Sequence, residues 1–119
     1  MPDHANRSLL LTIPGWILSA LLVLVFLSAG GLKLMSRPVA VQEFAQVGIG
    51  QWFRYFTGIL EVAGAIALLI PSLARWAAVV LAAVMSGAIV AHLTRLHTPP
   101  TLPGILLVLI LAVAGLRKL

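Results

Sequence analysis

The residue with the clearest chemical potential in this sequence is Glu61, a single carboxylate inside an otherwise apolar run that ends at Pro71. At 100° per residue, one side of a helix here carries Glu61 among small residues, and the opposite side is aliphatic. The small residues Gly58 and Gly64 are predicted to let another helix pack closely against the Glu61 side. A charge at membrane depth costs about 3 kcal/mol or more, so we expect Glu61 to face protein or water and to have a partner.

Three other side chains are predicted to reach the same layer as Glu61. Lys33 ends the first apolar run, which is directed toward the end of the molecule where the Glu61 helix begins. Arg54 precedes Glu61 by two helical turns, roughly 10 Å along the axis. His92 lies near the end of a third long run that returns to this end. The sequence therefore predicts a polar layer in which all four side chains converge.

Three roles for this polar layer are compatible with its residues. Glu61 could be a buried counter-ion that fixes the helix register and binds no substrate. The layer could instead be a small polar pocket for a proton, a quinone head group or another small ligand, with Met85 and His92 on one helix face. In the third role, Glu61 contacts another subunit.

Several kinds of chemistry are not predicted. The chain has no cysteine, which excludes thiol relays, thiolate metal sites and iron–sulfur ligation on this chain. No metal site is predicted, because His92 and His97 lie on different faces and the carboxylates do not cluster. The net charge is +5, but the basic residues lie at helix ends, as in membrane proteins, so we expect no nucleic-acid binding. A stand-alone enzyme is not predicted either, because the chain has few residues that could ligate a cofactor.

The elements that must position the layer are predicted to be membrane helices. The chain has 119 residues, of which 61% are hydrophobic and 9% charged, more apolar surface than a soluble domain of this size can bury. The apolar run before Lys33 is longer than the core of a signal peptide and has no convincing cleavage site, so it is interpreted as a retained helix.

The predicted fold is all-α: an integral membrane bundle of four transmembrane helices in a single domain, residues 1–119. The spans are expected at about 13–35, 53–70, 73–94 and 101–116, and the first is expected to start at a turn formed by Pro14 and Gly15. A short amphipathic helix at about 38–47 is predicted to lie in the membrane interface between the first two spans. Gly30 is predicted to support close helix packing together with Gly58 and Gly64.

Four spans place both termini on the same side of the membrane. If Lys33 and Arg54 are drawn into the protein toward Glu61, the remaining basic residues favour cytoplasmic termini.

The order and spacing of several fragments resemble the DoxX-like group of small four-helix membrane proteins. These fragments are Phe26-x-x-Ala29-Gly30-x-x-Lys33-Leu34, Gly58-x-x-Glu61-x-x-Gly64-Ala65 and Met85-x-x-Ala88-x-x-x-His92-Leu93, together with Phe44 and Gly48. The resemblance implies a bacterial inner-membrane protein of four spans. It also implies that the positions matching the family pattern are functionally relevant, without assigning them a catalytic role. These positions are Lys33, Gly58, Glu61, Met85 and His92. The family takes its name from a subunit associated with a terminal quinol oxidase and with thiosulfate:quinone oxidoreductase.

The resemblance favours a small accessory or partner subunit of quinone-linked redox metabolism. Its expected partners are the lipid bilayer, a redox-enzyme subunit and further copies of itself, and quinone is the one cofactor considered. An alternative is a small proton-coupled transporter, although cations beside Glu61 are unfavourable for binding cationic drugs. Another is a non-catalytic assembly or scaffold protein of the membrane.

Overall fold

The structure, a computed structural model, describes the backbone of residues 4–119 and the side chains of Leu10 and of residues 12–119. Residues 1–3 of the predicted domain lie outside the described residues. The all-α prediction is confirmed: residues 4–119 form five α-helices and one short π-helix and contain no strand. The elements are α1 His4–Leu34, α2 Pro38–Val47, α3 Gln51–Leu68, α4 Ala74–Ala91, the π-helix η1 His92–Leu96 and α5 Thr101–Leu116.

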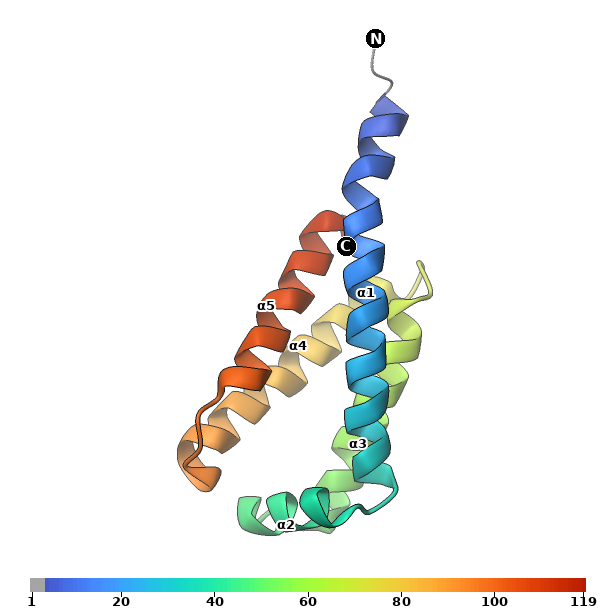
Figure 1. Cartoon of the computed structure of the whole chain (residues 1–119). Helices are drawn as coiled ribbons and strands as arrows, with labels where there is room; N and C mark the ends of the chain where they lie inside the picture. The colour runs from blue at the N-terminus through green and yellow to red at the C-terminus, as the bar shows by residue number, and fades with distance from the viewer. Residues whose placement is uncertain (1–3) are drawn as a thin grey trace.

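The four long helices run alternately down and up, and α2 lies across the end where α1 stops and α3 starts (Figure 1). α1 packs against α3 and α5, and α4 packs against the same two helices, so the contacts close into a ring. The largest apolar side chains of the core are almost fully buried: Leu22, Phe26, Leu68, Leu81 and Ile110. This arrangement brings the ends of α1 and α4 and the starts of α3 and α5 together near α2.

The bounds of α2 and α5 are those that the sequence predicts. Pro38 occupies the first turn of α2, where its missing N–H needs no partner. Gly48 ends α2 with a φ of +84°, and its N–H donates to the carbonyl of Phe44. α3 and α4 lie within three residues of their predicted bounds, and α4 continues into η1, which ends at His97 with a φ of +50°.

The first predicted span, 13–35, agrees with the apolar segment Thr12–Leu34, but the helix that contains it starts earlier than predicted. α1 begins at His4, not near residue 13, and it continues through Pro14 without the predicted turn. A proline inside a helix removes one backbone hydrogen bond. The C-terminal residues pack against the helix just after Pro14, where Gly15 is buried. The packing is close, because a Cβ on Gly15 would lie 2.7 Å from Cγ of Arg117.

Arg117, next to the C-terminus, contacts both α1 and α3. We call this group of residues the C-terminal clasp; it consists of Trp16, Ser19, Leu68 and Arg117. One guanidinium nitrogen donates to Oγ of Ser19 at 3.0 Å and to the carbonyl of Leu68 at 2.7 Å. The guanidinium carbon lies 3.8 Å from the centre of the Trp16 ring. Partial burial lowers the pKa of Arg117 from its usual value. An arginine nevertheless remains protonated at neutral pH, so the clasp retains its charge.

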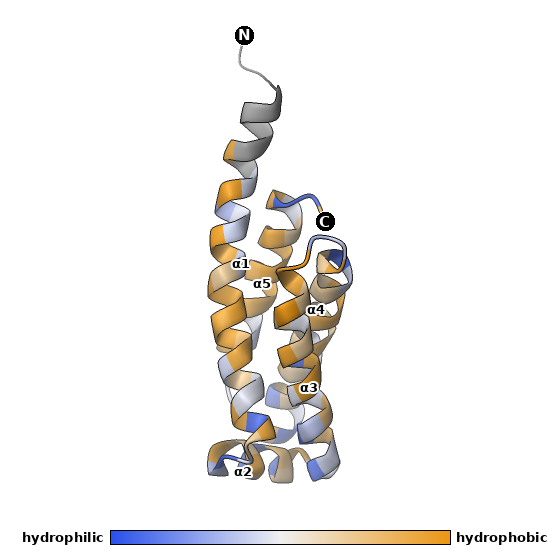
Figure 2. Cartoon of the chain, turned by 90° about the vertical axis from the view of Figure 1, so that its right-hand side faces the viewer, coloured by the Kyte–Doolittle hydropathy of each residue, from blue (hydrophilic) through white to orange (hydrophobic). Residues whose placement is uncertain are grey.

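Among the described residues, two helical segments are long and apolar enough to cross a membrane: Thr12–Leu34 of α1, and Ala74–Leu96, which comprises α4 and η1. α5 is also apolar but has 16 residues. Figure 2 shows hydrophobic residues along the long helices, with hydrophilic residues gathered near α2 and near the C-terminus. Large apolar side chains on the outer faces are exposed, among them Ile17, Leu24, Ile59, Ile66 and Leu111. Such a surface is typical of contact with lipid.

Candidate functional site

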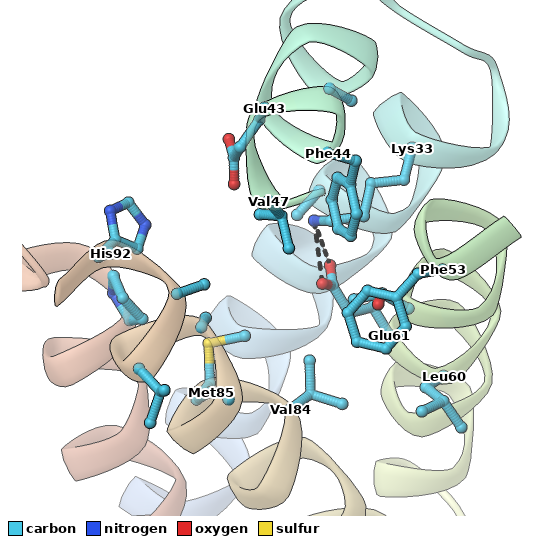
Figure 3. A pocket seen from close by; sticks show the side chains of 18 of the residues that line it. Lys33, Glu43, Phe44, Val47, Phe53, Leu60, Glu61, Val84, Met85 and His92 are labelled. Atoms are coloured by element: carbon cyan, nitrogen blue, oxygen red, sulfur yellow. Dashed lines mark hydrogen bonds and ion pairs between the residues drawn. The ribbon is translucent and has the colours of Figure 1, made fainter. Parts of the chain in front are cut away.

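The structure brings Lys33 and Glu61 together as the sequence predicts. Nζ of Lys33 lies 2.9 Å from Oε1 of Glu61 and donates a hydrogen bond to Oε2 at 3.2 Å. Figure 3 shows both contacts as dashed lines. Glu61 is 1% exposed, and Lys33 is partly buried. The carboxylate therefore has its partner inside the protein and does not face lipid or bulk water.

Close packing of α1 and α3 explains why these two side chains meet. A Cβ on Gly30 would lie 2.9 Å from the carbonyl oxygen of Gly58, and a Cβ on Gly58 would lie 3.1 Å from that of Gly30. Side chains on a helix lean toward its N-terminus. Because α1 and α3 run in opposite directions, Lys33 and Glu61 lean toward each other across the glycine contact.

Arg54 is 3% exposed, but it binds the backbone beside the ion pair and not Glu61. One terminal nitrogen donates to the carbonyl of Lys33, and Nε donates to Oε1 of Gln51 at 2.7 Å. Its guanidinium also lies 4.2 Å from the centre of the Tyr55 ring. Arg54 thus satisfies a backbone carbonyl at the end of α1, where a cation is favourable. Its place in the layer is that of a support for Lys33.

Met85 of α4 and His92 of η1 lie across from the ion pair (Figure 3). Nδ1 of His92 is 2.6 Å from Oγ1 of Thr98, so the imidazole has a partner in its own loop. Met85 is 6% exposed and belongs to the hydrophobic core. Both residues line the same cavity as Lys33 and Glu61. The predicted layer is therefore spread around a cavity, with the ion pair on one side and His92 on the other.

This cavity has a volume of about 970 Å³ and lies between α2, α3 and α4, with contributions from α1 and α5. Ala40, Phe44 and Val47 of α2 line it at one end. Its walls are mainly apolar and include Phe26, Phe53, Phe56, Leu60, Val80, Val84, Ala88 and Leu106. Pockets with apolar walls and a few convergent polar groups are typical of small-molecule sites. The arrangement suits a ligand with a small polar head and an apolar body.

The sequence did not predict that the carboxylate of Glu43 would lie at the cavity. Glu43 is half-buried on α2 and lines the cavity beside the buried Phe44. Figure 3 shows its carboxylate on the α2 side of the cavity. The amphipathic pattern assigns Glu43 to the polar face of α2. A residue next to Phe44 in a helix lies only 100° from it, however, and can border the buried face.

A family model described as the DoxX-like family matches residues 17–115. The uncharacterized protein YdgD of Bacillus subtilis (strain 168) is 41% identical over 76 residues, which cover 60% of this chain and 67% of YdgD. No solved structure matches the chain.

Proposed function

The chain belongs to the DoxX-like family, and from this membership and the site we propose a small membrane subunit that binds quinone for a partner redox enzyme. In this proposal the protein spans the bacterial inner membrane four times, with both termini in the cytoplasm. α3 and α5 have 18 and 16 residues, lengths of about 27 Å and 24 Å at 1.5 Å per residue. These lengths are close to the thickness of the hydrocarbon core, about 30 Å. A small mismatch is accommodated by the bilayer or by flanking residues.

The observation that carries the proposal is the ion pair of Lys33 and Glu61 at the edge of a large apolar cavity. A quinone carbonyl accepts hydrogen bonds, and a quinol hydroxyl donates them. The Lys33 ammonium is a donor and the Glu61 carboxylate is an acceptor, so the pair can serve both redox forms of one ligand. The aromatic and aliphatic walls would hold the ring by burial of apolar surface.

The proposed role is that of a partner subunit because this chain supplies binding groups and few redox groups. It has no cysteine. Within the described residues, no group of three His, Asp or Glu side chains is placed to hold a metal ion. In this proposal, electrons reach or leave the quinone through a partner enzyme, and this protein places the head group at Lys33 and Glu61.

The test separates ligand binding from a purely structural ion pair. Removing one partner of a buried pair is destabilising, whereas replacing both with apolar residues is often neutral. We therefore compare the wild type with the double variant Lys33→Met/Glu61→Met, with Lys118→Met as a matched control at an exposed site. Quinone retained through purification in mild detergent is counted by native mass spectrometry.

The wild type and Lys118→Met are expected to retain quinone, and the folded double variant is expected to retain none. Quinone-dependent electron flow through a co-purified partner should fall in Glu61→Gln. A folded double variant that binds quinone as the wild type does would refute the proposed site. Unchanged electron flow in an intact complex would refute the proposed role.

A further inference from the structure

The cavity opens between α3 and α4, where residues that line it are exposed on the outer faces of both helices. We propose that this opening is a lateral mouth within the bilayer, through which the prenyl tail of the bound quinone leaves the protein. The inference rests on the proposed function and adds to it the route of the tail. We define the lateral mouth by four cavity-lining residues, Phe56 of α3 and Ala83, Gly87 and Val90 of α4.

Exposure of the lateral mouth is the first observation. Phe56 is 50% exposed and Val90 is 58% exposed, although both line the cavity. Ala83 and Gly87 are exposed as well. A Cβ added to Gly87 would meet no atom within 4 Å, so the backbone of α4 borders open space here.

The packing of α3 and α4 explains why the opening lies at this height. The two helices are in close contact farther along, where a Cβ on Gly64 would lie 2.8 Å from Cδ2 of Leu81. Figure 1 shows them separating from there toward α2. Gly87 follows Leu81 on α4 and therefore lies in the part where the helices have separated.

The position of the mouth along the chain favours contact with lipid. Ala83, Gly87 and Val90 belong to the segment Ala74–Leu96, which is long and apolar enough to cross a membrane. All four side chains of the mouth are apolar or absent, so the opening offers no hydrogen bond to water. It suits a hydrocarbon chain.

The size and charge of the cavity favour a tailed, neutral ligand. At about 970 Å³ the cavity lies at the upper end of the range for small-molecule pockets, larger than a single quinone ring requires. Two basic side chains, Lys33 and Arg95, and two acidic side chains, Glu43 and Glu61, line the cavity. This balance favours a neutral quinone head over the anionic head of a phospholipid.

The experiment measures two ligands on three proteins by native mass spectrometry. The ligands are a long-tailed ubiquinone and the tailless dimethoxy-methyl-benzoquinone that carries the same head. The proteins are the wild type, Gly87→Phe, which fills the lateral mouth, and Gly104→Phe. Gly104 is the matched control, because a Cβ there also meets no atom within 4 Å and the residue does not line this cavity.

Gly87→Phe is expected to weaken binding of the long-tailed quinone about tenfold or more, since the tail loses its route and its apolar contacts. Binding of the tailless quinone should remain within about threefold, because the head group site is not altered. Gly104→Phe should change neither ligand. Should Gly87→Phe fail to fold, the smaller Ala83→Leu at the same mouth is expected to weaken only the long-tailed ligand.

Equal effects of the mouth variants on both ligands, or no effect on either, would overturn the lateral exit and leave the proposed function standing. A phospholipid that remains bound and is not displaced by ubiquinone would overturn it too. A wild type that binds neither quinone would overturn the proposed function, and the lateral exit would fall with it.

Discussion

Lys33 at the end of α1 and Glu61 in the middle of α3 form an ion pair at 2.9 Å, the one that the described side chains contain. The two residues lie one helical turn beyond Gly30 and Gly58, at which the helix backbones touch. The pair is thus built on a close backbone contact, and both the contact and the charges can be tested separately.

The first prediction concerns the stability of the ion pair. Lys33→Met leaves the carboxylate of Glu61 buried without its partner and should lower the free energy of unfolding by about 3–5 kcal/mol. Lys33→Met/Glu61→Met should recover most of this loss, since no buried charge remains. Unfolding by SDS titration from mild detergent measures both values. A double variant as unstable as the single one would show that more than the unpaired charge is lost.

The second prediction concerns the glycine contact. Gly30→Ala should destabilise the protein by about 1–3 kcal/mol, because the new Cβ would lie 2.7 Å from Cγ2 of Val62 and 2.9 Å from the carbonyl oxygen of Gly58. Gly31→Ala is the control in the same helix, where a Cβ meets nothing within 4 Å. It should be neutral or stabilising by about 0.5–1 kcal/mol. Equal effects in thermal unfolding would argue against a tight contact of α1 and α3.

The third prediction concerns the C-terminal clasp. Arg117→Met should lower the free energy of unfolding by about 2–3 kcal/mol, because Ser19 and the carbonyl of Leu68 lose a charged donor. Arg117→Lys should recover only part of the loss, because the lysine ammonium can donate hydrogen bonds but has no planar group to stack on Trp16. The exposed Lys118→Met serves as the control. An Arg117→Met protein as stable as Lys118→Met would mean that the clasp does not hold the C-terminus.

The fourth prediction concerns topology. A fluorescent protein at the C-terminus should fluoresce in the bacterium, and alkaline phosphatase inserted after Arg95 should be active, because it would reach the periplasm. The two basic side chains Lys33 and Arg54 point into the protein and would not act as cytoplasmic anchors. Activity of the phosphatase at the C-terminus instead would reverse the proposed orientation.

The boundaries of the short helix α2 could be predicted from the sequence. Pro38 and Gly48 bound α2 because one lacks an N–H and the other adopts a positive φ without strain, both properties of the single residue. The small residues around Glu61 predicted its face, and the alternating directions of the helices predicted its contact with Lys33. Each of these inferences uses spacing within one helix or the direction of neighbouring helices.

The tertiary structure alone decided which partners the long polar side chains take. Arg54 binds the carbonyl of Lys33 and not Glu61, and Arg117 binds Ser19, ninety-eight residues away in the chain. An arginine reaches several acceptors within its length, so the choice depends on which backbone groups the packed helices leave unsatisfied. The same packing carries α1 through Pro14 and turns Glu43 toward the cavity. Helical periodicity contains no information about such contacts, because they form between segments whose separation in space is set only when all the helices have packed.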